Sequence, residues 1–356
     1  MDKYAQFGQV MEERIRRGDY ALRDLPTELE LASEFGASRK TARRAIQELL
    51  EKGIVHRKPY GRLRVNQKHA RLQIAFLGTS FFSHPAEEWR FAVTRAAEKF
   101  DAAIRPVDFV HWNDPVIPET LKAFDGVFLL PSSETIPRAL LERFRDTAHL
   151  VSLEYDLSEW NVPSVHLLPP RSIHVLGDHL YKLGHRHIDC LNTQPADSVI
   201  QQRSEQWKGW SRLHKVQSCT YNEPVIPYQH AAPKAYEVMK RLLAAGEFKA
   251  TGLVCLTNAA AMGSIRALLE HGVRVGNDVS VCAMEGEPFA QLMSPSWTVL
   301  KVPEPHVYIE ACVEWIAGQN EPWTGPLLME PATMSLFEGE STGPAPEPRS
   351  EKKRKK

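Results

Sequence analysis

Short apolar runs alternate with amphipathic segments through most of the chain, and this alternation constrains the fold more than any other feature. Each run has the length of a strand, and the segments between runs repeat apolar residues at helical spacing. Strands buried on both faces and joined by helices form parallel sheets. The runs are 72–78, 126–131, 150–155, 187–192, 252–257, 279–284 and 297–302, and the clearest helical segments are 86–100, 172–184, 235–246 and 260–272.

The region that carries this alternation, residues 72–336, is larger than one hydrophobic core normally becomes. We therefore predict an α/β domain of two lobes with parallel sheets. Residues 1–66 would form a separate domain, joined to the lobes by a polar linker at 67–71. Residues 337–356 are rich in Pro and Gly and then basic, which predicts a disordered basic tail.

The first 66 residues have a different pattern, with three helical segments followed by two short strands around a Pro-Tyr-Gly turn. Thr27 and Glu30 have the spacing of a capping box, and Ser38 is the expected N-cap of the third helix. Gly36 and Gly53 mark helix ends. Three helices and a basic hairpin indicate a winged helix-turn-helix, which is an α+β fold.

Positive charge is concentrated next to this third helix. The chain is neutral overall, with 44 Lys and Arg against 44 Asp and Glu, yet residues 38–71 hold eleven Lys or Arg against two Glu. In a helical projection of 38–52 the apolar residues occupy one arc and most of the cations lie opposite. A cationic face can simply be solvated, but together with the caps and the wing it predicts nucleic-acid binding.

Residues 25–65, LPTELELASEFGASRKTARRAIQELLEKGIVHRKPYGRLRV, resemble the DNA-binding domain of the GntR family of bacterial transcriptional regulators. The shared motifs are LP-x-E, LA-x-x-x-G-x-SR-x-T-x-R and L-x-x-x-G-x-(V/I) before the wing. The resemblance implies major-groove and phosphate contacts for the third helix and a minor-groove approach for the wing tip. Leu29 stands where the family usually has Arg. The residues expected at the DNA are Ser38, Arg39, Lys40, Thr41, Arg43, Arg44, Gln47, Tyr60, Gly61 and Arg62.

The larger part of the chain is similar to the effector domain of LacI-type regulators. FDGVFLLPSS, LYKLGHRHI and the stretch 252–285 with its G-x-x-V-x-x-D-V-S-V motif carry this resemblance. It implies a periplasmic-binding-protein-like fold whose two lobes close on a small molecule, usually a sugar. A GntR-type domain ahead of a LacI-type domain resembles the arabinose-repressor group of the GntR family.

Ligand positions transfer from that family only in part. Asn258 matches the family's Asn, Glu285 stands where an Asp often binds sugar hydroxyls, and Gln206 replaces the usual Arg. These departures imply a less polar ligand, a different binding pose, or no ligand. The residues expected at the ligand are Asn258, Glu285, Gln206, Glu154 at the end of a strand, and Phe82, Trp89 and Tyr228, which are candidates to stack on a ring.

Other classes of function find little support. No apolar run reaches the length of a membrane span, and the N-terminus lacks a signal-peptide core, so we expect a cytoplasmic, nucleoid-associated protein without a membrane partner. The five cysteines are widely spaced and mostly lie in apolar strings, which predicts buried free thiols. His185 and His187 have metal-compatible spacing, but the family pattern explains His185 as part of a turn. We expect no metal, no cofactor and no enzymatic activity.

The sequence therefore predicts a sequence-specific DNA-binding transcriptional regulator, with repression as the expected direction. It would act as a homodimer on double-stranded operator DNA and respond to a small-molecule effector, with sugars as the class that the resemblance implies. The linker would transmit the motion of the lobes. Two alternatives stay open: a regulator without an effector, whose ligand cleft is degenerate, and a soluble solute-binding protein with an incidental basic domain.

Overall fold

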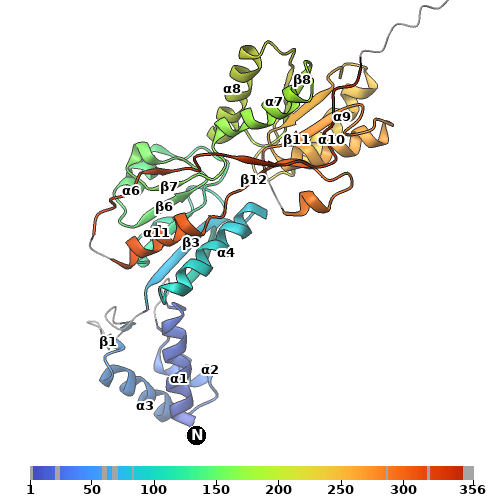
Figure 1. The fold of residues 1–356 in the computed structure, drawn as a ribbon. Coiled ribbons are helices and arrows are strands. Elements are labelled where there is room, and N and C mark those ends of the chain that lie inside the picture. Colours follow the sequence, from blue (N-terminus) through green and yellow to red (C-terminus); the bar gives the residue numbers. More distant parts are fainter. Residues whose placement is uncertain are drawn as a thin grey trace, which may run out of the picture. The chain divides into compact units, whose positions relative to one another are not determined.

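The computed structural model describes residues 3–20, 25–57, 62–65, 71–81, 84–285, 288–318 and 321–347. Two compact units make up the chain, and each contains segments that are distant in sequence (Figure 1). The first unit comprises Met1–Ser132, Ile136–Val165 and Pro305–Met329, and the second comprises Ser133–Thr135, His166–Glu304 and Glu330–Lys356. The chain thus enters the second unit, returns to the first and ends in the second.

The N-terminal part of the first unit, here called the head, is the predicted winged helix-turn-helix. Its buried apolar side chains come from all three helices and from the hairpin, so the head has its own hydrophobic core. The two strands pair antiparallel, with Val55 opposite Val65. The elements are α1 Lys3–Arg16, α2 Glu28–Glu34, α3 Arg39–Glu51, β1 Val55–Arg57 and β2 Leu63–Val65.

A six-stranded sheet forms the rest of the first unit, in the order β13-β7-β6-β5-β3-β4, with every neighbouring pair parallel. Helices α4 and α11 pack beside each other (Figure 1). The strands are β3 Gln73–Thr79, β4 Ala103–Phe109, β5 Gly126–Leu129, β6 Leu150–Leu153, β7 Ser164–Val165 and β13 Leu328–Met329. The helices are α4 His84–Lys99, α5 Val116–Ala123, α6 Arg138–Arg145, α11 His306–Ala317 and the short η2 Ser158–Trp160.

The second unit is built on another six-stranded sheet, in the order β14-β12-β11-β10-β8-β9. Its strands run parallel except for the β12–β14 pair, which is antiparallel. The strands are β8 Ile188–Asn192, β9 Thr220–Asn222, β10 Gly252–Cys255, β11 Ser280–Ala283, β12 Thr298–Lys301 and β14 Ser335–Phe337. The helices are α7 Ile173–Lys182, α8 Ser198–Leu213, α9 Ala231–Ala244, α10 Asn258–Glu270 and the short η3 Pro170–Ser172 and η4 Pro288–Leu292.

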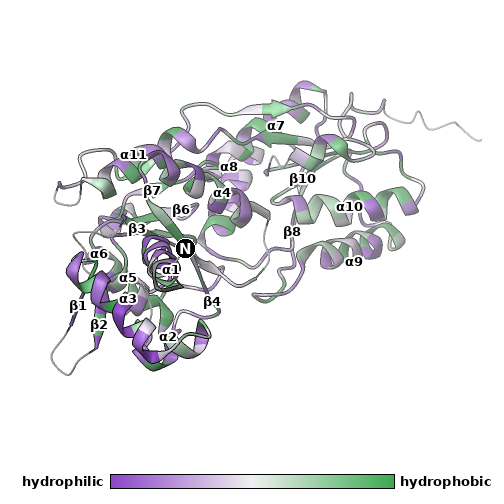
Figure 2. Ribbon diagram, turned by 90° about the horizontal axis from the view of Figure 1, so that it is seen from below, coloured by the Kyte–Doolittle hydropathy of each residue, from purple (hydrophilic) through white to green (hydrophobic). Residues whose placement is uncertain are grey.

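These sheets confirm the predicted fold class, since every one of the seven apolar runs forms a strand in one of two α/β lobes. The apolar strand β3 stands out in green, whereas the head helices carry many purple residues (Figure 2). Strand β4 was not among the predicted runs. Arg105, Pro106 and Asp108 interrupt its apolar pattern, which an edge strand tolerates because one of its sides has no pairing partner.

The predicted disorder of the whole tail from 337 is wrong for the described residues 338–347, which pack against the second unit. Ser341 is fully buried, its backbone oxygen accepts from Val281 N at 2.8 Å, and its Oγ accepts from Thr298 N at 2.8 Å. A Cβ on Gly339 would lie 2.6 Å from Ser296 O, so the glycine permits a close backbone approach. The small residues of this segment, whose composition predicted disorder, instead allow it to pack tightly against the second unit.

The described cysteines form no disulfide. Cys190, Cys255, Cys282 and Cys312 are buried and Cys219 is exposed. Burial raises the pKa of the Cys255 thiol to about 12, so this group stays a neutral thiol at physiological pH. Among the described residues, no helix combines the length and the apolar character that crossing a membrane requires.

Candidate nucleic-acid interface and effector site

Helix α3 begins at a side-chain cap. Ser38 Oγ accepts a hydrogen bond from Thr41 N at 3.1 Å and lies 2.9 Å from Thr41 Oγ1. An N-cap of this kind satisfies one of the backbone donors that a helix leaves open at its start. Ser38 and Thr41 are thereby held at the N-terminal end of α3, which is the end that helix-turn-helix proteins place against base edges.

Two faces of α3 differ sharply in burial and charge. The predicted apolar arc, Ala42, Ala45, Ile46 and Leu49, is buried in the head. Among the described residues, Arg39, Lys40 and Arg43 make no salt bridge, so these exposed charges remain available to an anionic partner. A row of uncompensated cations on a rigid helix suits a phosphate backbone. The exposed residues of this face are Arg39, Lys40, Arg43, Arg44 and Gln47.

Helix α2 supports α3 and begins with the predicted capping box. Thr27 N donates to Glu30 Oε2 at 2.7 Å, and Glu30 N donates to Thr27 Oγ1 at 3.3 Å. The side chain of Leu29, on the same helix, is 66% exposed. An exposed Leu at the position where the GntR family usually has Arg leaves α2 without that cation.

The wing is only partly within the described residues. Arg62 is exposed just before β2, and Tyr60 and Gly61 lie outside the described part. Arg57, at the end of β1, donates from Nη2 to Glu28 Oε1 at 3.2 Å and so ties the wing to α2. Strands β1 and β2 also share one hydrophobic core with α2 and α3.

The head is joined to the lobe of the first unit by direct contacts as well as by the predicted linker. Gln73 Nε2, at the start of β3, donates to Arg16 O at 3.2 Å and to Arg71 O at 2.8 Å. A Cβ on Gly18 would lie 1.7 Å from Gln73 Oε1, and Gly18 has a φ of 78°. Only glycine fits this approach comfortably. Residues 67–70 of the linker lie outside the described part of the chain.

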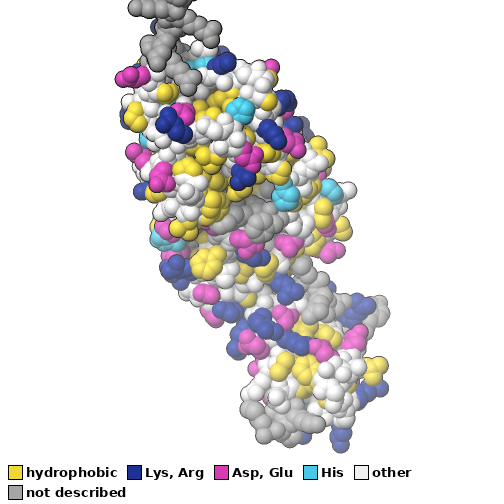
Figure 3. Space-filling view, turned by 90° about the vertical axis from the view of Figure 1, so that its right-hand side faces the viewer, with side chains coloured by type: hydrophobic (Ala, Val, Ile, Leu, Met, Phe, Trp, Pro, Cys, Tyr) yellow, Lys and Arg dark blue, Asp and Glu magenta, His cyan; other side chains and the backbone are white. Residues whose placement is uncertain are grey.

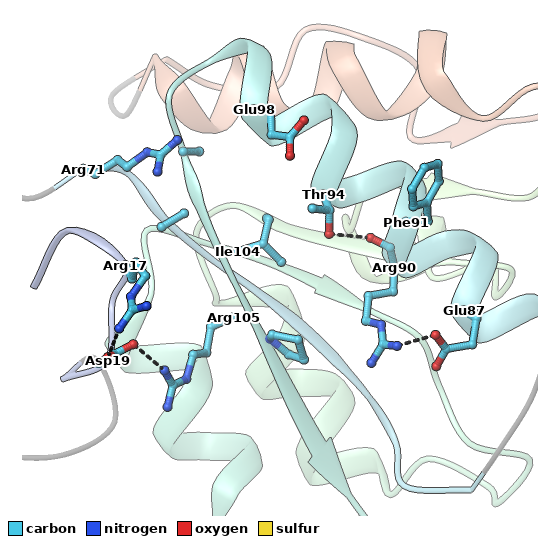
Figure 4. Close-up of a pocket in the computed structure, with 13 residues that line it drawn as sticks. Arg17, Asp19, Arg71, Glu87, Arg90, Phe91, Thr94, Glu98, Ile104 and Arg105 are labelled. Carbon is cyan, nitrogen blue, oxygen red and sulfur yellow. Dashed lines mark hydrogen bonds and ion pairs between the residues drawn. The ribbon is translucent and has the colours of Figure 1, made fainter. Parts of the chain in front are cut away.

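An ion pair borders the same junction. Asp19 Oδ1 accepts from Arg105 Nη1 on β4 at 3.3 Å, and Asp19 Oδ2 accepts from Arg17 Nη2 at 3.1 Å (Figure 4). These side chains and residues of α4 and β4 surround a hollow of about 940 Å³. Both basic and acidic side chains line this hollow, namely Arg17, Arg71, Arg90, Arg105, Asp19, Glu87 and Glu98. Lys and Arg side chains are likewise interspersed with Asp and Glu on the face shown in Figure 3. The mixed charges suit an intramolecular contact better than an anion site.

Gly18→Ala is expected to lower the Tm of the protein by about 2–4 °C, because it adds strain at a positive φ and displaces Gln73. Differential scanning calorimetry measures this change. The matched control is Gly209→Ala, since a Cβ at Gly209 on α8 would meet nothing within 4 Å. An unchanged Tm in Gly18→Ala would contradict the described junction.

In the second unit, polar side chains meet beyond the carboxyl ends of β10 and β11, where open α/β sheets bind ligands. Arg203 of α8 donates from Nη1 to Leu256 O at 3.0 Å and to Glu285 Oε1 at 3.3 Å. Glu285 Oε2 accepts from the backbone N of Asn258 at 3.1 Å. The structure thus brings Asn258 and Glu285 together and adds Arg203.

Gln206, which the sequence suggested for this place, is exposed on α8, one turn away from the buried Arg203. Gln206 lies three residues before Gly209, and Arg203 lies three residues before Gln206. Residues three apart are neighbours on one face of a helix, so the sequence alone could have suggested Arg203 as a second candidate. Tyr228 is half-buried in the second unit, with a φ of 71°. Phe82 lies outside the described residues.

Trp89 and Glu154 meet within the first unit. Trp89 is 4% exposed, and its Nε1 donates to Glu154 Oε1 at 3.2 Å. Glu154 follows β6 and has a φ of 60°, a backbone conformation that non-glycine residues adopt at a cost and often at functional positions. An aromatic ring beside a carboxylate is a combination that can hold a polyol or a cation.

Metal-binding geometry is not found among the described residues, where no group of three or more His, Cys, Asp or Glu is placed to hold an ion. His185 is buried, and its two ring nitrogens lie 2.9 Å from Thr251 Oγ1 and 3.0 Å from Gly343 O. Burial lowers the pKa of His185. This imidazole serves packing of the C-terminal segment.

Known proteins resemble both parts of the chain. Residues 3–65 match the model of bacterial regulatory proteins of the gntR family, and residues 177–342 match that of a periplasmic binding protein-like domain. The probable HTH-type transcriptional repressor ExuR of Bacillus subtilis (strain 168) is 22% identical over 246 residues, which are 69% of this chain and 71% of that protein. An arabinose metabolism transcriptional repressor of Halalkalibacterium halodurans is 24% identical over 310 residues, 80% of each chain.

Solved structures share the fold. The lac repressor dimer bound to operator and the anti-inducer ONPF aligns with a TM-score of 0.61 and 18% identity, covering 77% of this chain and 94% of that chain. At 18% sequence identity, the likeness establishes the fold, which is the arrangement of the helices and strands.

Proposed function

We propose that this chain, a transcriptional regulator that joins a gntR-family DNA-binding domain to a periplasmic-binding-protein-like domain, binds double-stranded operator DNA through α3 and the wing. It would act as a repressor, since the relatives described above bear that name. It would work as a homodimer on the nucleoid in the cytoplasm, with two heads on a two-fold-related operator. The operator-bound lac repressor dimer supports this arrangement by analogy.

The observation that carries DNA binding is the exposed cationic face of α3, set over a buried apolar face and begun by Ser38. The test is to incubate the full-length protein with fragmented genomic DNA of its source at physiological salt and to sequence what co-purifies. A few enriched fragments that share a two-fold-symmetric site would support the proposal. A recovered pool indistinguishable from the input would contradict it.

The second part of the proposal is that a small molecule binds in the two-lobed domain and changes operator affinity. A ligand shifts the equilibrium only by its different affinity for the two states of the protein. The buried polar atoms of Arg203 and Asn258 that find no hydrogen-bond partner within the described part of the chain favour a ligand over a degenerate site. Thermal melts with a panel of sugars and metabolites test this part, and a panel without any stabilising compound would favour the effector-free alternative.

Leu29→Arg is expected to steepen the salt dependence of operator binding, because it places a cation on α2 where the GntR family usually has one. The slope of log K against log salt should become more negative by roughly 0.9 if the new side chain neutralises one phosphate. Leu213→Arg is the matched control, since Leu213 is 78% exposed on α8 in the second unit. Equal slopes for the two variants would argue against α2 facing DNA.

A further inference from the structure

Three buried polar atoms gather beyond the carboxyl ends of β10 and β11 without a hydrogen-bond partner among the described residues. They are Arg203 Nε and the Oδ1 and Nδ2 atoms of Asn258. Arg203 is 5% exposed and Asn258 is 3% exposed. Leaving a buried polar group unpaired costs about 1–3 kcal/mol, so such groups in a native fold call for a missing partner. Within the described residues, the Nδ2 atom of Asn258 therefore has no acceptor to donate to, and its Oδ1 atom has no donor to accept from.

Glu285 lies between a guanidinium group and the N-terminus of a helix. Its Oε1 accepts from Arg203 Nη1 at 3.3 Å, and its Oε2 accepts from Asn258 N at 3.1 Å. Asn258 is the first residue of the 13-residue helix α10, and a helix N-terminus attracts anions through its free N–H groups and its dipole. A guanidinium and a helix N-terminus therefore form an anion seat, which the carboxylate of the chain itself fills.

The charge of a second carboxylate, that of Asp197, also acts on this site. Asp197 caps α8 by accepting from Ile200 N at 2.9 Å and is buried enough that desolvation raises its pKa. Arg203 attracts this carboxylate and Glu285 repels it. Glu285 is thus paired with Arg203 at 3.3 Å, and Asp197 adds a second negative charge within electrostatic range. An incoming acid would be the third, and in a poorly solvated site its repulsion would outweigh the attraction of Arg203.

We infer that Glu285 takes the place of an anionic ligand group at this site, so that the effector is an uncharged or cationic molecule such as a polyol or an amine, and acids and phosphates are excluded. This inference rests on the proposed function, because it assigns the ligand class of the same two-lobed domain. A hydroxyl group both donates and accepts and would satisfy the amide of Asn258. Glu285 would accept a second hydrogen bond from the same ligand.

The test is to empty the seat with Glu285→Ala and to offer inorganic phosphate as the probe. Thermal melts of the full-length protein in phosphate are compared with melts in chloride at matched ionic strength. Phosphate stabilises folded proteins in general relative to chloride, so the increments are compared. We expect phosphate to raise the Tm of Glu285→Ala by about 2–4 °C more than it raises the Tm of the wild type. The matched control is Glu205→Ala, an exposed carboxylate on the same helix as Arg203, which should behave like the wild type.

Glu285→Gln provides a second variant in case the alanine variant does not fold, since it keeps the shape of the side chain and removes its charge. A gain of phosphate stabilisation in either Glu285 variant would support the inference. Equal responses of the wild type and both variants to phosphate would overturn it. If phosphate binds as an adventitious ion only, it would stabilise the Glu205→Ala control as much as the Glu285 variants. That result would also overturn the inference.

Operator binding is measured separately on the same preparations, so the two proposals fail in distinguishable ways. Absence of operator binding with phosphate stabilisation of Glu285→Ala would contradict the regulator function and keep the site assignment. Normal operator binding without any phosphate effect would keep the regulator function and remove the assignment of Glu285.

Discussion

Arg39→Ala and Arg43→Ala are each expected to lower the ratio of specific to non-specific operator affinity by roughly 10–100-fold while leaving the fold intact. Both side chains are exposed on α3 and make no salt bridge among the described residues, so their loss removes no intramolecular contact. Loss of one bidentate contact between Arg and guanine costs about 1–3 kcal/mol of discrimination, which is up to roughly 100-fold in affinity ratio. Fluorescence anisotropy with specific and scrambled duplexes measures the ratio.

The matched control for these variants is Arg138→Ala. Its side chain on α6 is 84% exposed, so the substitution removes the same charge from a surface far from α3 in the sequence. Circular dichroism and thermal melts show whether each variant folds. Normal discrimination in both Arg39→Ala and Arg43→Ala would show that α3 is not the recognition helix.

Truncation after Phe337 is expected to destabilise the second unit severely. It removes the acceptors of Val281 N and Thr298 N, both of which pair with Ser341, and also removes the contacts of Gly343 with Ser280 and His185. Each buried group left unpaired costs about 1–3 kcal/mol. We expect a fall in Tm of at least ~10 °C, or insoluble protein.

Truncation after Glu347 is the matched control, because it removes only residues outside the described part, including the basic end of the chain. The Tm of this shorter truncation should equal that of the full chain. A truncation after Phe337 that melts like the full chain would show that residues 338–347 contribute nothing to the second unit. Calorimetry of the two truncations side by side decides the matter.

Local patterns explain why the head was predictable. The cap at Ser38, the capping box of Thr27 and Glu30, and the buried arc of α3 all depend on residues within a few positions of each other. Helical period and caps are local rules, and they do not require knowledge of distant partners. The apolar runs predicted the two sheets for the same reason, since continuous hydrophobic strands are typical of parallel sheets.

Long-range contacts explain what the sequence did not reveal. Ser341 is buried because the N-terminal parts of β11 and β12 supply its hydrogen bonds, and no local pattern in a Pro- and Gly-rich segment indicates this. Arg203, rather than Gln206, reaches Glu285 because of the rotation of α8 about its axis. The junction of Gly18 with Gln73 joins residues that no motif connects.

The most direct test of the account is the affinity of the full-length protein for its enriched genomic fragment compared with a scrambled fragment of the same length and composition. Both are measured at physiological salt, because electrostatic binding depends strongly on salt. We expect the specific fragment to bind at least about 1,000-fold more tightly than the scrambled one. Equal affinities for the two fragments would contradict the claim that α3 reads DNA sequence.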